Sequence, residues 1–438
     1  MIKRRGFPRI FFGWWTVLVT GLMAGLGSGF YSYGFSVFFK PLASELGFSR
    51  AVTSVAAAVG RLEGGLASPL AGWLADKFGP RWVIFLGTWM VAIGLVLMNY
   101  INSLWVFYAV WGGLIGFGTN LAYTVAPDKA ITNWFVRKRG LALGTRFVFW
   151  GIASMIVLPT VTWLVTTLGW RTTNFLWAWV IFATLPAGWF LVKQNRPEYY
   201  GLLPDNATAQ EEAAGTGQMI DKGVEYAAEI GEVEFTVRQA WKTRAYWMLL
   251  IAWCTGMIVT GGIGIHVIPF LTDMGIDPTE ASGMMAMMVF FTIPSRFLGG
   301  VVGDRIRRNH LQFSLAVTFV FLAAGITAIV LKQTIAMIYV FLILYGLGSG
   351  ASSPLRIMIG SRYFGRKAFG SILGSILMVE APLGFLAPIY SGWIYDTQGS
   401  YITAFITFAA LATFSAFLMF LVRPPKPPEI VTDIRKVV

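Results

Sequence analysis

Charged side chains are scarce in this 438-residue chain. Asp, Glu, Lys and Arg make up 13% of the sequence and hydrophobic residues 56%, whereas soluble domains carry about 25% charged residues. Apolar windows such as 82–100 and 404–422 approach the roughly 20 residues that a helix needs to cross a hydrocarbon layer about 30 Å thick. The composition therefore excludes an ordinary soluble domain and indicates a protein that lies in a lipid bilayer.

Cysteine and histidine are nearly absent, which excludes several classes of site. The one cysteine, Cys254, lies inside an apolar segment, so neither a disulfide framework nor a Cys-rich metal site can form. The chain has no Gly-Lys-Ser/Thr phosphate loop and no zinc-ligand pair at helical spacing. Its net charge of +13 is spread between apolar segments, unlike the single basic face of a nucleic-acid binder. We expect no cofactor, metal, nucleic acid, enzymatic activity or ATP-driven transport.

Charged and turn-forming clusters divide the sequence into twelve predicted membrane-spanning helices. The predicted spans are 11–38, 50–74, 82–100, 104–131, 140–166, 172–193, 245–271, 281–303, 311–331, 335–361, 369–394 and 402–422. Lys and Arg gather on alternate connections, as at 3–5, 137–139 and 305–308. Since basic connections stay in the cytoplasm, we expect both termini there. We expect an integral protein of a prokaryotic inner or plasma membrane.

One long hydrophilic stretch, Lys193–Thr243, separates six predicted spans from the other six. It contains an acidic pair, Glu211-Glu212, and a Gly/Ala-rich run at 213–217. We interpret it as a partly disordered cytoplasmic linker. The predicted organisation is an N-terminal bundle at 1–193, the linker at 194–243, a C-terminal bundle at 244–424 and a cytoplasmic tail at 425–438.

The two halves repeat each other at an offset of about 230 residues. Three similar motifs follow in the same order, which pair 72–81 with 300–308, 134–144 with 363–374, and 169–175 with 399–405. Such an ordered repeat indicates duplication. A doubled bundle is expected to hold its substrate at the interface of the halves, near the middle of the membrane.

The segment 72–81 resembles the loop signature of the major facilitator superfamily, a Gly-x-x-x-Asp-Arg/Lys-x-Gly-x-Arg/Lys run between the second and third helices. Glycine allows close helix approach, and an aspartate can cap a helix or pair with a basic residue. The resemblance implies an all-α membrane fold of twelve transmembrane helices in two duplicated six-helix bundles. It also implies a cytoplasmic gate that contains Gly72, Asp76, Arg81, Asp304 and Arg305.

Within that superfamily the chain resembles the monocarboxylate and oxalate/formate transporter branch. The similar motifs are Gly13-Trp14-Trp15, 38–42, Trp134-Phe135 with 138–142, 363–367, and Arg296 followed by Gly299-Gly300 and Asp304. In that branch an arginine of the eighth helix binds the substrate carboxylate, and Arg296 stands at its place. Animal monocarboxylate carriers have an aspartate one turn earlier, where this chain has Thr292, and some have a first-helix lysine that residues 31–35 lack.

Arg296 is also singled out by its position in an apolar span. A charge near the bilayer centre costs at least about 2.5–3.5 kcal/mol, so the side chain should face a cavity or a partner. Its guanidinium fork suits a carboxylate. The alternative is an ion pair that only joins helices. In the family the fourth helix lines the cavity, so Asn120 and Tyr123 are further candidate substrate contacts.

The remaining intramembrane charges have two open interpretations. Superfamily architecture places the second and eleventh helices together, so Glu63 and Glu380 either share a proton between them or pair with arginines such as Arg61 and Arg146. His266 either relays protons or is a hydrogen-bonded core residue. Four residues lie within about two turns of the cytoplasmic ends and are expected to pair locally or reach the interface. These are Asp128, Lys129, Arg146 and Arg356.

These observations predict a secondary active transporter that moves a small organic anion, a monocarboxylate, by alternating access together with protons. One alternative is an exchanger of two carboxylates that moves no protons. A membrane sensor that does not transport, or a channel, is a further alternative. We expect the protein to work as a monomer or a weak oligomer.

The substitution Arg296→Lys tests the proposed carboxylate clamp, because it keeps the charge and removes the bidentate fork. We expect it to lower carboxylate uptake into proteoliposomes. Uptake equal to that of the parent protein would show that Arg296 does not clamp the carboxylate.

Overall fold

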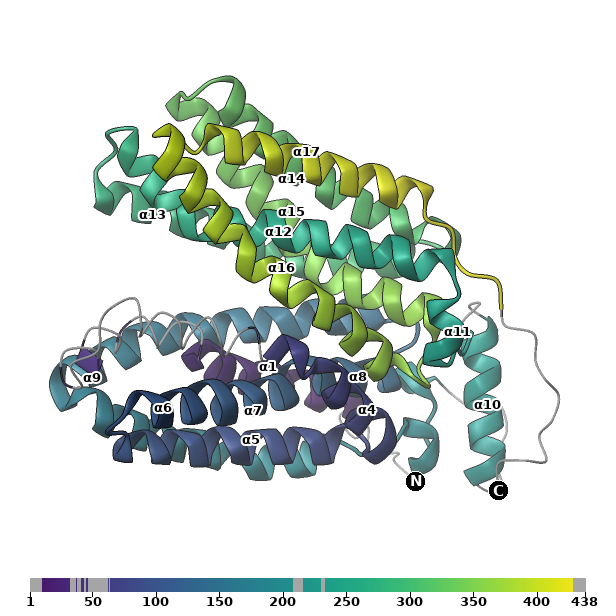
Figure 1. The fold of residues 1–438 in the computed structure, drawn as a ribbon. Helices are drawn as coiled ribbons and strands as arrows, with labels where there is room; N and C mark the ends of the chain where they lie inside the picture. The colour runs from purple at the N-terminus through teal and green to yellow at the C-terminus, as the bar shows by residue number, and fades with distance from the viewer. Residues whose placement is uncertain are drawn as a thin grey trace, which may run out of the picture.

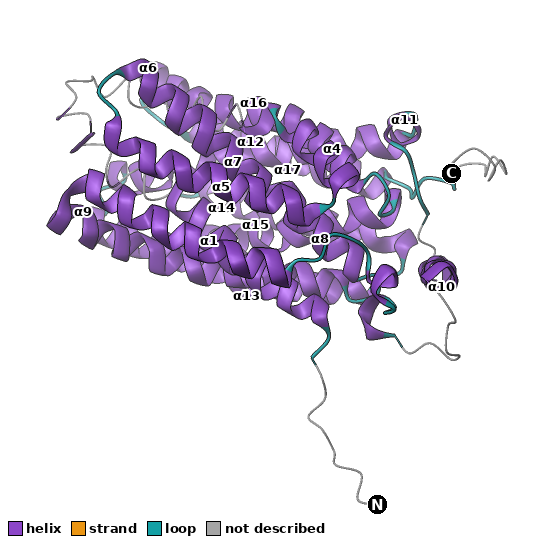
Figure 2. Cartoon of the chain, turned by 90° about the horizontal axis from the view of Figure 1, so that it is seen from below, coloured by secondary structure: helices purple, strands orange, loops and turns teal. Residues whose placement is uncertain are grey.

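The computed structural model describes residues 10–31, 64–207, 216–229 and 233–427, together with Val37, Pro41, Leu42, Glu45 and Leu62. Within these residues the regular structure is entirely helical (Figure 2). Nine of the described helices are long and apolar enough to cross a membrane. The predicted all-α membrane fold is confirmed. The predicted span 50–74 lies mostly outside the described residues.

The first half contains α1, α4, α5, a long composite helix and α9. Their bounds are α1 (Phe12–Gly29), α4 (Ser68–Phe78), α5 (Pro80–Leu97), α6 (Leu104–Phe107), η3 (Tyr108–Gly116), α7 (Phe117–Asn120), η4 (Leu121–Val125), α8 (Ala126–Trp134) and α9 (Arg139–Leu191). The run from α6 to α8 is continuous, with π-helical turns at η3 and η4. Such turns are frequent at functional sites.

The element α9 holds two of the predicted crossings. Its helix is interrupted at Gly169, where φ is 80° and ψ is 163°. Glycine adopts a positive φ readily because it has no Cβ. The predicted spans 140–166 and 172–193 lie on either side of this break.

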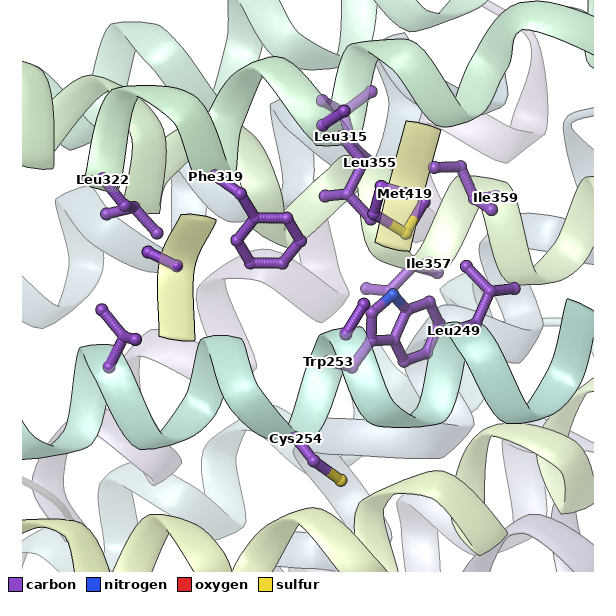
Figure 3. Packing of buried hydrophobic residues seen from close by; sticks show 14 of the residues in the cluster. Leu249, Trp253, Cys254, Leu315, Phe319, Leu322, Leu355, Ile357, Ile359 and Met419 are labelled. Atoms are coloured by element: carbon purple, nitrogen blue, oxygen red, sulfur yellow. The ribbon is translucent and has the colours of Figure 1, made fainter. Parts of the chain in front are cut away.

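The second half contains six helices that correspond to the six spans predicted there. They are α12 (Arg244–Asp273), α13 (Pro278–Arg305), α14 (Leu311–Leu331), α15 (Ile335–Phe364), α16 (Phe369–Gln398) and α17 (Ile402–Leu421). Trp253 on α12 points toward the neighbouring helices of this bundle, where Phe319 and Leu355 also lie, whereas Cys254 points the opposite way (Figure 3). A Cβ on Gly256 would lie 2.6 Å from the Phe319 ring, so this glycine leaves room on α12 for that ring of α14.

The described residues of the linker between the halves are largely helical. It contains η5 (Pro197–Tyr200), η6 (Pro204–Asn206), α10 (Thr216–Glu229) and α11 (Val237–Trp241). Thr236 and Gln239 form a reciprocal capping box that starts α11. We call the end of the bundles that carries these elements the linker end (Figure 1).

The two halves meet along two helix pairs, α4 with α16 and α9 with α13. Near the linker end each pair is in contact through two glycines. A Cβ on Gly72 would lie 2.0 Å from the Gly370 carbonyl oxygen, and one on Gly300 would lie 2.0 Å from that of Gly140. Small residues allow helix backbones to approach this closely. The bundles therefore touch at the linker end and diverge toward the opposite end (Figure 1).

Because these contacts leave no room for a methyl group, Gly72→Ala and Gly300→Ala should force the bundles apart. Overpacking of this kind costs about 1–3 kcal/mol, so we expect a lower melting temperature for the purified protein in detergent. Gly264→Ala is the control, since a Cβ there has no heavy atom of a described residue within 4 Å. Equal melting temperatures for all three variants would contradict the proposed backbone contact.

Candidate functional site

A cavity of about 420 Å³ lies between the two bundles. Its walls come from both halves, with α1, α4, the α7–α9 region, α12, α15 and α16 all contributing side chains. Among the described residues, the charged side chains that line it are two arginines and two carboxylates: Asp128, Arg146, Arg356 and Glu380. The cavity lies at the interface of the two halves, where the duplicated sequence predicts a substrate site.

One ion pair joins α8 and α9 within the first half. Arg146 Nη1 lies 2.6 Å from Asp128 Oδ1, and Arg146 Nη2 donates to the Tyr123 carbonyl oxygen at 2.7 Å. Both charged side chains are buried. In a medium of low dielectric constant, each charge is tolerated because the other is beside it.

A second ion pair joins α15 and α16 within the second half. Arg356 Nη2 donates to both carboxylate oxygens of Glu380, at 2.6 and 2.7 Å. Glu380 is buried, while the Arg356 side chain keeps 21% of its surface exposed. The two pairs occupy related places in the repeat, but the signs are reversed, since the first half has its arginine on the later helix and the second half on the earlier one.

Two tryptophans that line the cavity each make a cation–π contact with an arginine. Arg296 Cζ lies 5.1 Å from the centre of the Trp150 ring, and Arg356 Cζ lies 5.1 Å from that of Trp253. Such stacking stabilises a desolvated guanidinium. Arg296 is not among the side chains that line the described cavity. It reaches the cavity wall through Trp150.

Asn120 and Tyr123, predicted from the sequence as substrate contacts, both line the cavity. Asn120 donates to the Ser68 hydroxyl at 2.9 Å, which connects the composite helix with α4. Tyr123 packs on Gly27, where a Cβ would lie 2.1 Å from its ring. Since Gly27 leaves the room that the phenol ring occupies, α1 helps to fix the Tyr123 position.

His266, another predicted charge-network residue, is not among the described side chains that line this cavity. His266 Nε2 lies 3.0 Å from the Pro388 carbonyl oxygen, and its ring contacts Tyr401, so within the described structure it joins α12 to α16. Arg61 and Glu63 lie outside the described residues. The proposed closeness of Glu63 and Glu380 therefore stays a prediction.

At the linker end, two carboxylates cap helices across the interface. Asp76, near the end of α4, accepts hydrogen bonds from the backbone N–H groups of Gly370 at 3.1 Å and Ser371 at 2.7 Å. Asp304, near the end of α13, accepts them from Gly140 and Leu141, both at 2.7 Å. A helix N-terminus favours a negative charge. We call Asp76 and Asp304 the gate carboxylates.

Each gate carboxylate also has a cation nearby. Lys129 Nζ lies 2.7 Å from Asp76, and Arg362 Nη2 lies 3.3 Å from Asp304. Of the other predicted gate residues, Arg81 donates to the Val192 carbonyl oxygen at 3.0 Å instead, and Arg305 is exposed at the end of α13. The close approach at Gly72 brings α4 against α16 where Asp76 caps it.

Part of the cavity wall is not evident from the sequence. The positions of Arg356 and Asp128 predict that these residues pair locally or reach the interface, and their ion pairs also line the cavity. Trp150 follows Arg146 by four residues and so lies on the same helix face, a spacing that makes it recognisable in advance. No comparable spacing pointed to Trp253, since it lies on α12 and reaches Arg356 of α15 only through packing.

Comparisons with known proteins agree with this architecture. Residues 17–388 match the family model described as Major Facilitator Superfamily. The chain is 25% identical over 433 residues to monocarboxylate transporter 13 of Bos taurus, covering 96% of this chain and 93% of that protein. It is 24% identical over 408 residues to monocarboxylate transporter 2 of Homo sapiens, covering 89% and 81%. The structure of the proton:xylose symporter XylE has a TM-score of 0.67 at 13% identity, covering 94% of each chain.

Removing one member of a buried pair leaves the other charge uncompensated. Asp128→Asn should therefore destabilise the protein by about 3–5 kcal/mol and lower its melting temperature in detergent. The double variant Asp128→Leu/Arg146→Met removes both charges, and we expect it to recover most of that loss. If Asp128→Asn melts like the parent protein, the pair does not hold α8 against α9.

Proposed function

This chain belongs to the major facilitator superfamily, and we propose that it moves a small organic anion, a monocarboxylate, across the membrane by alternating access to its central cavity. The family membership makes it an integral membrane transporter and not an enzyme. Duplicated bundles of this kind rock about a site at their interface. The monocarboxylate class is supported by the names of the relatives at about 25% identity.

The observation that carries the anion proposal is the environment of Arg356. One of its nitrogens, Nη2, makes both bonds to Glu380. Within the described residues no hydrogen bond is made by Nη1 or Nε, and the side chain is partly open to the cavity. A guanidinium has five donors in a planar fork, so Arg356 can hold Glu380 and still offer donors to a carboxylate. Arg296, beyond Trp150, is the second proposed contact.

Proton coupling follows from the same pair. A substrate carboxylate at Arg356 competes with Glu380 for the guanidinium. A carboxylate that loses its counter-charge in a buried site is stabilised by taking up a proton. We therefore propose symport in which a proton on Glu380 compensates for the arriving substrate. In the alternative, carboxylate exchange, a second anion takes the place of the first and Glu380 keeps its charge.

The linker end is proposed to face the cytoplasm, with both termini. Basic residues gather on the connections at this end, such as 137–139 and 305–308, as the positive-inside rule requires of cytoplasmic loops. With the gate carboxylates bonded, the cavity is then closed toward the cytoplasm. The prokaryotic membrane stays a prediction, since the two monocarboxylate transporters compared above are mammalian.

Thermal stabilisation of the purified protein by a panel of mono- and dicarboxylates tests the substrate class, because a ligand that binds only the folded state raises the melting temperature. We expect stabilisation by monocarboxylates, stronger at acid than at neutral pH. It should be lost in Arg356→Ala and Arg296→Ala and retained in Arg423→Lys, an exposed control. No response to any carboxylate, with folded variants, would contradict the anion proposal.

Uptake into proteoliposomes distinguishes the two coupling modes. Symport predicts that an inward proton gradient, with the outside more acid, drives uptake into empty vesicles. It also predicts that Glu380→Gln uncouples uptake from this gradient. Exchange predicts uptake only into vesicles loaded with carboxylate, whatever the gradient. The second result would replace proton symport by antiport and leave the carboxylate site in place.

A further inference from the structure

The connection between α15 and α16 inserts one side chain into the opposite bundle. Arg366 is only 1% exposed, although it lies on a connection at the linker end. Its Nη1 donates to the Asn133 carbonyl oxygen at 3.1 Å and to Glu198 Oε1 at 3.2 Å. Asn133 belongs to α8, and Glu198 lies in η5, just after the last helix of the first half. The pair Arg366–Glu198 therefore crosses from one bundle to the other.

Further contacts hold the same connection from both sides. Lys129 Nζ donates to the carbonyl oxygens of Arg366 and Lys367. Glu234, from the second-half side of the linker, accepts the Lys367 backbone N–H and pairs with Arg196, from the first-half side, at 3.0 Å. Burial disfavours a charged Glu234, but Arg196, Arg366, the Lys367 N–H and Lys129 together outweigh it, so the pKa of Glu234 is held below its usual range. The Arg196–Glu234 pair therefore joins the two ends of the linker beside Arg366.

The helix α10 covers Glu198. A Cβ on Gly223 would lie 2.3 Å from Glu198 Cγ and 2.4 Å from its Oε1, so α10 packs directly against the carboxylate. Glu198 is 3% exposed as a result. Only a residue without a side chain fits at position 223 while α10 lies in this place.

The linker also contacts the matching connection before α9. Asp205 in η6 accepts hydrogen bonds from the backbone N–H groups of Val136, Arg137 and Lys138, at 2.7–3.0 Å. The gate carboxylate Asp304 accepts the N–H groups of Gly140 and Leu141 at the same helix start. The connections that lead into α9 and α16, the two helices that meet the opposite bundle, are therefore both held by a gate carboxylate and by a linker carboxylate.

The Arg366–Glu198 pair is poorly arranged for stability alone. Glu198 Oε2 is buried, and no described residue donates to it. Buried ion pairs contribute little net stability because desolvation offsets their attraction, and a switch between states is one of their attested roles. When the bundles separate at the linker end, both partners regain water. The pair is therefore buried and bonded when the linker end is closed, and hydrated when the linker end is open.

We propose that the linker is a third part of the gate, in which Glu198, sealed by α10, holds Arg366 and so favours the conformation with the linker end closed. Glu198 is a positioning residue in this scheme, because it acts through the connection between α15 and α16 and does not line the central cavity. The inference rests on the alternating-access motion proposed above. It does not depend on which solute is carried.

The test measures the conformational equilibrium without substrate. Spin labels on Lys138→Cys in the first half and Asn309→Cys in the second, both exposed positions at the linker end, report the opening by their separation in a Cys254→Ser background. We expect Glu198→Gln to raise the ratio of long to short distances by roughly tenfold, a size typical of conformational coupling. A Glu198→Gln distance distribution equal to that of the parent would overturn the proposal.

We call the Arg366–Glu198 pair and its cover, α10, the linker lock. Two further variants distinguish the effect of this lock from a general loss of structure. Gly223→Leu pushes α10 off Glu198 and keeps every charge, and we expect it to raise the open population as well. Glu229→Gln makes the same chemical change in the same linker at an exposed pair, where Glu229 and Arg137 lie 2.8 Å apart and are 59% and 51% exposed. It should leave the distances unchanged. Opening in Glu229→Gln equal to that in Glu198→Gln would contradict a specific lock.

The outcome is independent of the carboxylate proposal. If no carboxylate stabilises the protein and Glu198→Gln still opens the linker end, the lock stands and the substrate class is wrong. If carboxylates stabilise the protein and neither Glu198→Gln nor Gly223→Leu changes the distances, the lock is wrong and the substrate class stands.

Discussion

The closed linker end depends on two backbone contacts between helices, at Gly72 with Gly370 and at Gly140 with Gly300. Because no side chain separates these backbones, Asp76 and Asp304 reach the N-terminal N–H groups of the helix opposite them. A carboxylate at a helix start is favoured by the unpaired N–H groups and by the helix dipole. The same contact sets how far the bundles diverge toward the opposite end, and so where the cavity lies.

The charged residues of the cavity are subject to a second constraint. A charge in a dry interior needs an opposite charge beside it. Each half meets it with its own pair, Asp128 with Arg146 and Arg356 with Glu380. Both arginines line the cavity, but the pairs differ in exposure, since the Arg146 side chain is 4% exposed and that of Arg356 is 21% exposed. Duplication therefore supplied two similar frameworks. One now holds a less exposed pair that joins helices, and the other holds a more exposed pair, which we propose as the contact for an incoming anion.

The linker adds a third layer to this arrangement. In a bundle that rocks about its interface, each contact that crosses the interface at one end must break in every cycle. Hydrogen bonds and ion pairs suit such a contact, because water replaces them when the bundles separate. The buried Arg366–Glu198 pair and its cover, α10, make that exchange with water depend on the position of the linker. An element that connects two bundles in the sequence can in this way also influence their equilibrium.

The sequence by itself determined the bilayer environment, the helical crossings and the duplication, because hydrophobic length and repeated motifs are properties of the chain read in order. It also pointed to Asp76 and Asp304, since their spacing from glycine repeats in both halves. Only the tertiary structure decided the partners. Arg356 joins Glu380, Lys129 joins Asp76, and Arg366 joins Glu198 across distances in sequence that no periodicity encodes. Helix packing brings such residues together, so their pairing depends on the three-dimensional arrangement of whole helices and not on local spacing.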